Sequence, residues 1–222
     1  MVTYAVVAAA GFNDVDFLSR KESGCFDAVI AVDAGLRHMQ GCDVSADFVI
    51  GDFDSLGYEP THPNVIRHSP IKDARDLELA LDFAVERGAQ AIFAYGCLSG
   101  RLDHTLAALQ NLAAVSEQGL KVVAIAEGVQ DDKAGFEDGM AVAFLSGPAA
   151  LDLPAADHAG VSVFSLSERC TGVTEEGMFY PLENAELTNR TSLGLSNQLI
   201  GVPASVRVLS GTVCVMCPAR LV

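Results

Sequence analysis

Short apolar runs alternate with helical periods over the first two thirds of the chain. The runs are rich in Val, Ile, Phe and Ala, as is typical of buried parallel strands. They predict strands at Thr3–Ala10, Ala28–Val32, Phe48–Ile50, Val65–Arg67, Ala91–Tyr95 and Val122–Ala126. Between them, apolar residues fall on one face of two predicted helices, Asp73–Arg87 and Asp103–Gln118. This alternation predicts an open, mostly parallel α/β sheet with crossover helices.

The pattern changes after about Gly135. From Met140 to Val222 there is no long helical period, only short apolar segments separated by turn residues. They predict strands at Val161–Leu166, Thr171–Thr174, Ala185–Thr188, Leu195–Ile200, Ser205–Leu209 and Thr212–Met216. We therefore expect an α/β domain over residues 1–135, followed by an antiparallel β-sandwich or barrel over residues 136–222.

Composition and charge narrow the range of partners. The chain has 222 residues, of which 50% are hydrophobic, and its net charge is −15 with no basic patch. A nucleic-acid-binding protein usually shows such a patch, so we expect no nucleic-acid partner. No apolar run approaches the roughly 20 residues that span a bilayer, and the N-terminal stretch lacks the basic region of a signal peptide. We therefore expect a cytoplasmic protein with no membrane partner.

The cysteine pattern favours packing over chemistry. In a cytoplasmic protein the six cysteines are expected to be reduced. Cys214 and Cys217 have the C-x-x-C spacing of zinc and redox sites, but they lie in an apolar, strand-like segment with no second pair. We expect them to be packed in the core, with a zinc or redox role as the alternative.

Aspartates follow the predicted strands at the ends where open α/β sheets bind their ligands. Asp33 follows Ala28–Val32, and Asp52 and Asp54 follow Phe48–Ile50. Residues two apart in extended backbone project to the same side, so Asp52 and Asp54 can share one cation. The alternative interpretation is a turn, because Gly, Asp and Ser are common turn residues.

Two further segments carry polar residues at predicted helix starts. Asp73 and Asp76 are three apart and face the same way in a helix, either as ligands or as a cap with a capping-box partner. The loop after Ala91–Tyr95 contains glycines and leads into the next helix. Its free N–H groups suit phosphate oxygens, and Arg101 can grip a phosphate in a bidentate manner. Asp103 can serve there as a cap or as a ligand.

Together these carboxylates predict a metal site. Strand ends and the helix starts that follow them converge on one edge of a parallel sheet, where carboxylates repel one another unless cations neutralise them. The aspartates concerned are Asp33, Asp52, Asp54, Asp73, Asp76 and Asp103. Mg²⁺ typically binds through few carboxylates together with phosphate oxygens. The residues therefore predict an enzyme that uses Mg²⁺ and a nucleotide, without identifying its other substrate.

These segments, in this order, resemble the motifs of the thiamine pyrophosphokinase family. Gly51–Ser55 is similar to the family's G-D-x-D-S segment. Similar segments of the first half are Asp33–Gly35 (Asp-Gly-Gly type), Lys72–Asp76 (K-D-x-T-D) and Ser99–His104 (G-G-R-x-D-H). In the second half, Gly177–Leu182 resembles a G-x-x-Y-P-L region and Leu193–Asn197 resembles a G-x-S-N signature. The resemblance covers nearly the whole chain.

The resemblance implies an ATP-dependent thiamine diphosphokinase, which transfers pyrophosphate from ATP to the hydroxyl of thiamine and releases AMP. It also implies an α/β catalytic domain followed by a β-sandwich, and a homodimer with thiamine bound at the subunit interface. The implied ligands of Mg²⁺ are Asp52, Asp54, Asp73 and Asp76. Asp103 would join the acidic cluster, and Asp33 would lie near the reacting hydroxyl, so that either Asp33 or Asp54 accepts its proton.

The resemblance also assigns the two small molecules to particular residues. ATP would be contacted by Asp73, Arg75, Ser99, Gly100 and Arg101. Ser196 and Asn197 would help to bind the thiamine pyrimidine. The implied catalytic residues are Asp33, Asp52, Asp54, Asp76 and Asp103.

Three residues depart from the family motifs. Arg75 stands in place of threonine, and Ser99 and Ala34 stand in place of glycine, where each adds a Cβ to permissive backbone. Because the acids are retained, we expect an active enzyme. The alternatives are a pyrophosphokinase for another hydroxymethyl heterocycle such as a pterin, a non-catalytic nucleotide or thiamine sensor, and a Mg²⁺-dependent phosphohydrolase.

Overall fold

The computed structural model describes residues 1–68, 75–129 and 135–222. The chain forms two compact units. The N-terminal unit comprises residues 1–115 and 124–126, and the C-terminal unit comprises residues 116–123 and 127–222. Strand β6 (Lys121–Ala126) therefore contributes residues to both units.

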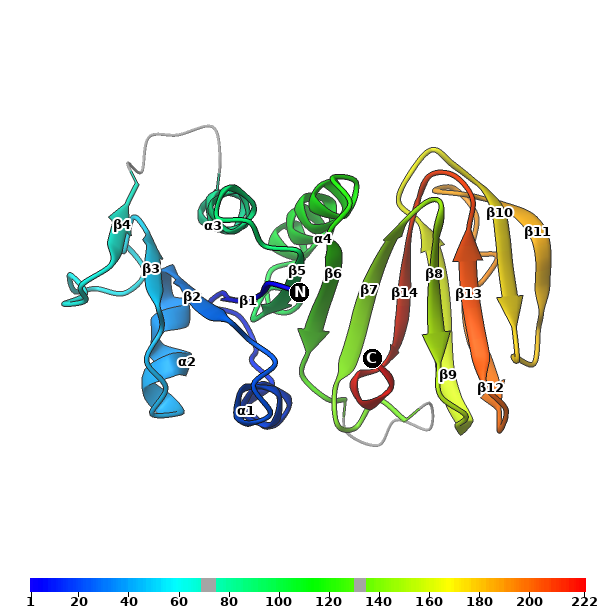
Figure 1. Cartoon of the computed structure of the whole chain (residues 1–222), viewed down its shortest axis with the longest axis horizontal. Helices are drawn as coiled ribbons and strands as arrows, with labels where there is room; N and C mark the ends of the chain where they lie inside the picture. Colours follow the sequence, from blue (N-terminus) through cyan, green and yellow to red (C-terminus); the bar gives the residue numbers. More distant parts are fainter. Residues whose placement is uncertain (69–74, 130–134) are drawn as a thin grey trace. The chain divides into compact units, whose positions relative to one another are not determined.

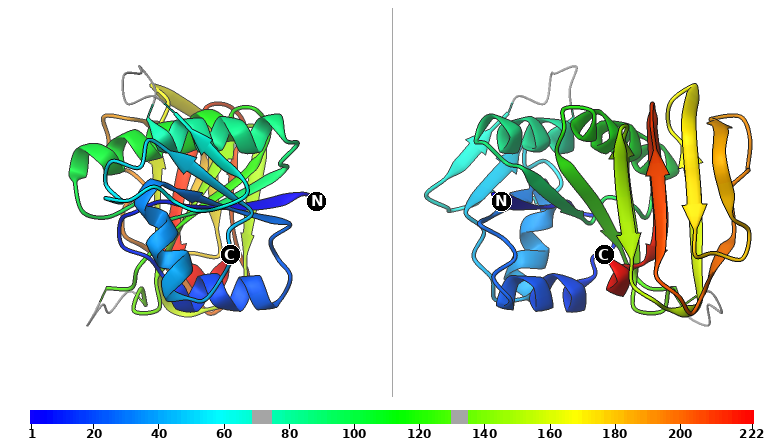
Figure 2. Two further views of the ribbon diagram at one scale, coloured as in Figure 1. Left: turned by 90° about the vertical axis from the view of Figure 1, so that its left-hand side faces the viewer. Right: turned by 45° about the vertical axis from the view of Figure 1, so that its right-hand side comes forward.

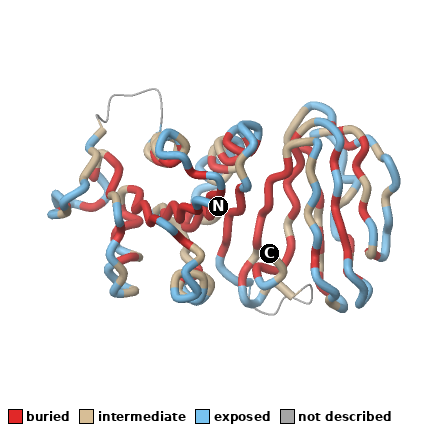
Figure 3. The backbone as a smooth tube through the Cα atoms, in the orientation of Figure 1, coloured by how far each residue is buried: buried red, intermediate tan, exposed pale blue. Residues whose placement is uncertain are grey.

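The N-terminal unit is built on a parallel sheet (Figure 1). Its strands are β1 (Thr3–Val7), β2 (Ala28–Val32), β3 (Phe48–Gly51), β4 (Val65–Arg67) and β5 (Ala91–Tyr95). They lie in the order β5-β1-β2-β3-β4. Strands β1, β2 and β5 are buried along their whole length, as their apolar sequences predict (Figure 3). The predicted α/β sheet is confirmed, although the strand expected at Thr3–Ala10 ends at Val7.

Helices cover both faces of this sheet. They are α1 (Asp14–Glu22), α2 (Leu36–Gly41), α3 (Asp76–Glu86) and α4 (Leu102–Ser116), with a short 3-10 helix η1 (Asp33–Gly35) before α2. Helices α3 and α4 lie over one face, and α1 and α2 lie over the other (Figures 1 and 2). Each follows a strand, as the crossover connections of a parallel sheet require.

Local sequence explains where the helices begin. Helix α1 starts after Asn13, whose side chain accepts a hydrogen bond from the backbone N–H of Asp16 at 3.0 Å. Helix α3 starts at Asp76, and its N-cap residue Arg75 makes no side-chain cap bond. The predicted start at Asp73 lies outside the described residues. A capping box would place Asp76 at the third helical position. Asp76 is instead the first helical residue, where its charge complements the helix dipole.

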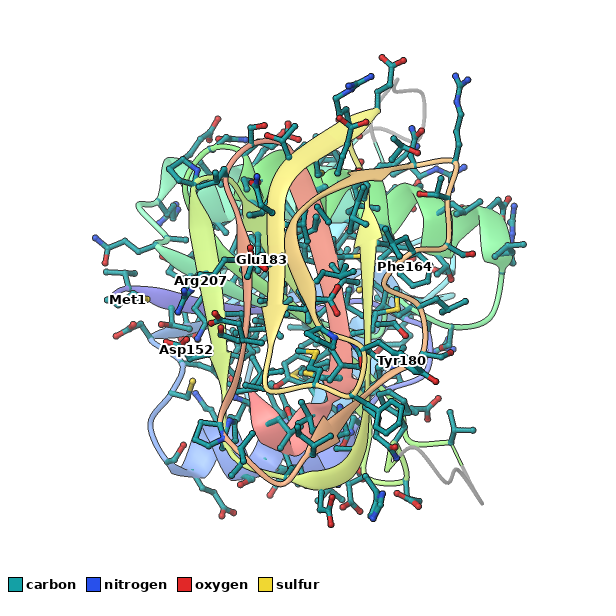
Figure 4. All side chains as sticks on the ribbon, turned by 90° about the vertical axis from the view of Figure 1, so that its right-hand side faces the viewer. Met1, Asp152, Phe164, Tyr180, Glu183 and Arg207 are labelled. Carbon is teal, nitrogen blue, oxygen red and sulfur yellow. The ribbon has the colours of Figure 1, made fainter. Side chains whose placement is uncertain are left out.

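The C-terminal unit contains two antiparallel sheets, with strand orders β12-β9-β14-β7 and β11-β10-β13-β8. The strands are β7 (Met140–Ser146), β8 (Ala149–Leu153), β9 (Asp157–Ser165), β10 (Arg169–Glu176), β11 (Leu182–Thr188), β12 (Asn197–Ile200), β13 (Ala204–Val208) and β14 (Thr212–Pro218), followed by η2 (Ala219–Leu221). Figure 4 views this unit with the second sheet in front of the first. Along β9, Ala159, Val161 and Val163 alternate inward, which places a core between the sheets.

The predicted antiparallel β-sandwich is confirmed, with two strands that the sequence did not predict. Strands β7 and β8 flank Gly147 and Pro148, which form the turn at which the chain passes from the first sheet to the second.

The cysteines are packed in the way that the sequence predicts. None of the six, all of which lie in the described residues, is in a disulfide. Cys214 and Cys217 are buried three residues apart on β14, so their side chains point to opposite faces and cannot share an ion. Burial raises the pKa of Cys214 to about 11 and that of Cys217 to about 12.

Over residues 1–68, 75–129 and 135–222, no helix is both long and apolar enough to cross a lipid bilayer.

Candidate functional site

Three aspartates of the N-terminal unit form an acidic cluster. One carboxylate oxygen each of Asp33, Asp52 and Asp76 lies within 4.8 Å of the other two. Asp33 follows β2, Asp52 follows β3, and Asp76 opens α3. Adjacent parallel strands and a helix start therefore bring together side chains that are far apart in the sequence, at the edge where open α/β sheets bind ligands.

Two glycines allow the backbone around this cluster to pack closely. A Cβ added at Gly51 would lie 3.1 Å from the Cα of Asp33 and 3.2 Å from its Cβ. A Cβ added at Gly35 would collide with the backbone carbonyl of Val7, on the neighbouring strand β1. Glycine at these positions lets the ends of β1, β2 and β3 approach one another, which sets the spacing of the aspartates.

Both the backbone conformation and the carboxylate contacts of Asp33 are unusual. Its backbone φ is 49°, in the left-handed region that few non-glycine residues adopt. One of its oxygens, Oδ2, accepts a hydrogen bond from the Ser55 hydroxyl. The other, Oδ1, is buried and has no hydrogen-bond partner among the described residues. A buried carboxylate oxygen without a partner, beside two other carboxylates, matches the hard oxygen ligands of Mg²⁺.

The loop that follows β3 carries Asp52 and is hydrogen-bonded to α2 through Arg37. Arg37 donates hydrogen bonds from Nη2 to the backbone carbonyls of Ser55 at 3.2 Å and Leu56 at 2.8 Å. Phe53 is buried in this loop with a φ of 66°. Asp52 accepts a hydrogen bond from the Asp54 N–H at 3.1 Å, which closes the turn.

The structure does not bring Asp54 into the acidic cluster. We expected Asp52 and Asp54 to point the same way because residues two apart do so in extended backbone. Phe53 between them is left-handed, so the backbone is not extended there. Asp54 is exposed and Asp52 is half-buried. Of the other expected ligands, Asp73 lies outside the described residues and Asp76 belongs to the cluster.

Arg101 and Asp103 form an exposed ion pair beyond β5. Arg101 donates from Nη2 to Oδ2 of Asp103 at 2.6 Å and from Nε to Oδ1 at 3.1 Å. The Arg101 guanidinium lowers the pKa of Asp103 to about 2, so this carboxylate stays ionised. Asp103 belongs to no acidic cluster in the described part of the chain. It orients Arg101 instead, and the pair offers a planar cation for a phosphate.

Two of the departures from the family motifs have visible contacts. Ser99 accepts a hydrogen bond from the backbone N–H of Gly11 at 2.7 Å, which joins the loop after β1 to the loop after β5. The Arg75 Nη1 atom lies 3.1 Å from Nε2 of His104, at the start of α4. Gly100, which follows Ser99 in this loop, has a φ of 80° that favours glycine. Sequence reasoning identified neither Gly11 nor Arg37 as part of the site.

The C-terminal unit has a pocket of its own, with a volume of about 400 Å³. Its lining includes Phe136, His158, Phe179, Tyr180, Ser196 and Asn197. The rings of Phe179 and Tyr180 meet edge to face with their centroids 4.8 Å apart. Ser196 is exposed with a φ of 57°, and its backbone N–H donates to the Ser162 hydroxyl at 3.0 Å. The pocket thus combines aromatic surface with an exposed serine.

Asn197 lines this pocket but is buried, and its amide is fully used inside the protein. Its Nδ2 donates to Oε2 of Glu175 and to the carbonyl of Tyr180, both at 2.7 Å. Its Oδ1 accepts from the backbone N–H groups of Tyr180 at 3.0 Å and Gln198 at 2.9 Å. An asparagine amide has two donors and one carbonyl acceptor, so none of its donors is left for a ligand.

Sequence models of two domains match this chain. One is described as "Thiamin pyrophosphokinase, catalytic domain" and matches residues 22–124, and the other as "Thiamin pyrophosphokinase, vitamin B1 binding domain" and matches residues 151–213. Together they span well over half of the chain. The chain belongs to the thiamine pyrophosphokinase family. The expected enzyme is thereby confirmed, and the acidic cluster lies in the part that matches the catalytic domain.

Individual members of the thiamine pyrophosphokinase family agree with this placement. The chain is 29% identical over 178 residues to a thiamine pyrophosphokinase of Bacillus subtilis, covering 77% of this chain and 78% of that protein. Its fold is similar to a crystal structure of thiamine pyrophosphokinase from Bacillus subtilis, with a TM-score of 0.76, 24% identity and coverage of 99% and 100% of the two chains. A Candida albicans thiamin pyrophosphokinase has the same fold, with a TM-score of 0.74, 13% identity and coverage of 97% and 88%.

Proposed function

We propose that this enzyme transfers the pyrophosphoryl group of ATP to the hydroxyl of thiamine, giving thiamine diphosphate and AMP. The observation that carries the proposal is the cluster of Asp33, Asp52 and Asp76, which lies in the part that matches the family's catalytic domain. The pocket beside Ser196 lies largely in the part that matches the vitamin B1 binding domain. We assign catalysis to residues 1–135 and the ring-binding surface to residues 136–222.

The acidic cluster fits Mg²⁺. Its ligands would be carboxylate oxygens of Asp33, Asp52 and Asp76, including the buried Oδ1 of Asp33 that has no other partner in the described part of the chain. The family motifs also imply Asp54, which lies outside the cluster, and Asp73, which lies outside the described residues. When bound, the ion supplies positive charge next to the phosphate oxygens. The protein would then contribute mainly by positioning the two substrates, as enzymes that transfer phosphoryl groups generally do.

The phosphates of ATP have candidate partners in the loop after β5. Arg101 presents a guanidinium that Asp103 holds in place at 2.6 Å. Gly100 and Ser99 form the turn before α4, and Arg75 adds a second cation next to His104. These groups would orient the triphosphate so that its β-phosphorus faces the thiamine hydroxyl.

The proton of the attacking hydroxyl needs an acceptor, and two aspartates are candidates. Asp33 lies in the acidic cluster and already accepts from the Ser55 hydroxyl. Asp54 lies outside the cluster and is exposed, so its carboxylate is available to a substrate. Comparison of Asp33→Asn with Asp54→Asn separates the roles, because loss of a base lowers kcat whereas loss of a ligand also raises the Mg²⁺ requirement.

Thiamine would be held on the pocket of the C-terminal unit. The Ser196 hydroxyl is exposed there, and Phe179 and Tyr180 offer ring surface for a heterocycle. Asn197 contributes by holding the wall of the pocket. The proposed homodimer would complete the site with the partner subunit. Large exposed apolar side chains next to the pocket, Phe179 at 61%, Tyr180 at 65% and Leu195 at 50% relative exposure, support such an interface. We place the enzyme in the cytoplasm, where its free cysteines remain reduced.

The test is an incubation of the purified protein with thiamine, ATP and Mg²⁺, followed by chromatography for AMP and thiamine diphosphate. We expect equal amounts of the two products, their loss on addition of EDTA, and their loss in Asp52→Asn. Binding of thiamine and ATP without turnover would support a sensor instead. Turnover of a hydroxymethyl pterin in place of thiamine, or release of inorganic phosphate without an acceptor, would support the other two alternatives, which family membership argues against.

A further inference from the structure

Glu175 is a buried acid at an unexpected place, in the inward-facing pattern of β10. Its side chain is 0% exposed, and within residues 135–222 it makes no salt bridge. Burial raises its pKa, and the hydrogen bond from Asn197 partly opposes this effect. A carboxylate that is desolvated without a cation is unfavourable on its own, so its presence calls for a role in the structure around it.

The two oxygens of Glu175 contact both ends of the segment Gly194–Asn197. Oε2 accepts a hydrogen bond from Nδ2 of Asn197 at 2.7 Å. Oε1 lies against Gly194, where an added Cβ would be 3.2 Å away, and it has no hydrogen-bond partner among the described residues. This segment carries Ser196 into the pocket. Glu175 therefore supports the segment from inside the β-sandwich.

Asn197 connects Glu175 to Tyr180 in the aromatic wall of the pocket. Its amide bonds to both the N–H and the carbonyl of Tyr180, at 3.0 Å and 2.7 Å. The Asn197 side chain thus satisfies both backbone polar groups of Tyr180, as a neighbouring strand would. If the acceptor on Glu175 were lost, one amide N–H of Asn197 would be buried without a partner, and the amide would be free to turn.

We propose that Glu175 is a positioning residue for thiamine, which fixes the amide of Asn197 and through it the relative placement of Tyr180 and Ser196. This inference rests on the proposed function, because it takes the pocket to be the thiamine site. Glu175 does not itself line the pocket and acts through Asn197, which does, so we expect its loss to weaken thiamine binding and to leave ATP and Mg²⁺ binding unaltered.

The test compares Glu175→Met, Glu175→Gln and the matched control Glu176→Met in steady-state kinetics. Methionine has a similar size but offers no acceptor to Asn197, so we expect KM for thiamine to rise about tenfold or more, with KM for ATP within about twofold of wild type. Glutamine retains a carbonyl acceptor and should keep KM for thiamine within about threefold. Glu176 is exposed on the same strand, and its replacement should leave KM for thiamine unchanged.

A second readout does not depend on any ligand. In ¹⁵N-labelled protein, the side-chain amide signals of Asn197, assigned by their absence in Asn197→Asp, should show slow hydrogen exchange in wild type and Glu175→Gln and fast exchange in Glu175→Met. An active wild type whose KM for thiamine is unaltered in a folded Glu175→Met protein, or whose Asn197 amide stays protected there, would overturn the inference. A wild type that produces no AMP with thiamine would instead overturn the proposed function.

Discussion

Gly51 packs so closely against Asp33 that a Cβ at Gly51 would lie 3.1 Å from the Cα of Asp33. The two residues come from the ends of neighbouring strands, β3 and β2, and Asp52 follows directly after Gly51. The distance between two members of the acidic cluster is therefore set by backbone contact. Any side chain at Gly51 would push the strand ends apart.

Gly51→Ala should consequently weaken both the fold and the site. Overpacking of a tight contact costs about 1–3 kcal/mol, and displacement of the carboxylates should lower kcat about 10- to 100-fold. Denaturant unfolding and steady-state assays would measure the two effects. Gly41→Ala is the control, because an added Cβ at Gly41 meets nothing within 4 Å and should leave activity unaltered. Normal activity in Gly51→Ala would contradict the proposed arrangement of the cluster.

Arg37 should control the affinity for Mg²⁺ without touching the ion. It donates to two carbonyls of the loop that carries Asp52 and Ser55. Removal of residues that hold metal ligands in place commonly costs about 10- to 100-fold in metal affinity. We expect Arg37→Ala to raise the Mg²⁺ concentration at half-maximal activity by about tenfold, with a smaller effect for Arg37→Lys. Arg67→Ala, which removes an exposed pair with Glu59, should have no effect on the Mg²⁺ dependence.

Ser99 should contribute to ATP binding through Gly11. The hydroxyl accepts from the Gly11 N–H at 2.7 Å and so couples two loops at the edge of the sheet. One neutral hydrogen bond is worth about 0.5–1.5 kcal/mol. We expect Ser99→Ala to raise KM for ATP about two- to tenfold and to leave KM for thiamine unchanged. Ser45→Ala, in an exposed loop of the same unit, serves as the control. A lower KM for ATP in Ser99→Ala would show that the hydroxyl blocks a phosphate contact.

The buried Glu175 should make stability depend on pH. Its pKa in the folded state is raised above the ordinary value of 4.5, so from about pH 4.5 up to the raised pKa the folded state binds more protons than the unfolded state. Its contribution to the free energy of unfolding therefore falls as pH rises through this window. The stability of Glu175→Gln relative to wild type should increase over the same window and then level off. Urea unfolding of both proteins between pH 4 and 8 would measure this, and parallel curves would contradict it.

Much of the fold could be predicted because the strands of the N-terminal unit carry uninterrupted apolar runs. The predicted bounds of Ala28–Val32, Val65–Arg67 and Ala91–Tyr95 agree with the structure. The short helix α2 was missed, since Leu36–Gly41 is too brief to show a period. Strand β8 was missed because it is short and only Leu153 of its residues is buried, which leaves a weak apolar signal.

The candidate site could be predicted in part, to the extent that residue type alone determines it. Asp33, Asp52 and Asp76 were expected at strand ends or helix starts, and the structure places them together. The position of Asp54 could not be predicted, because it depends on the left-handed backbone of Phe53. The contacts through which Arg37 and Glu175 support the site could not be predicted either. They join segments that are distant in sequence, and nothing in the local pattern encodes such pairs.

The acidic cluster has a consequence for the folding of the N-terminal unit. Asp33 follows β2, Asp52 lies in the loop after β3, and Asp76 opens α3, so the three come from separate segments of the chain. A cation held by all three would act as a reversible cross-link between chain segments that are independent in the unfolded state. Any ligand that binds only the folded state stabilises it by mass action. The melting temperature of this enzyme would therefore rise with the free Mg²⁺ concentration, and depletion of the ion would lower thermal stability together with activity.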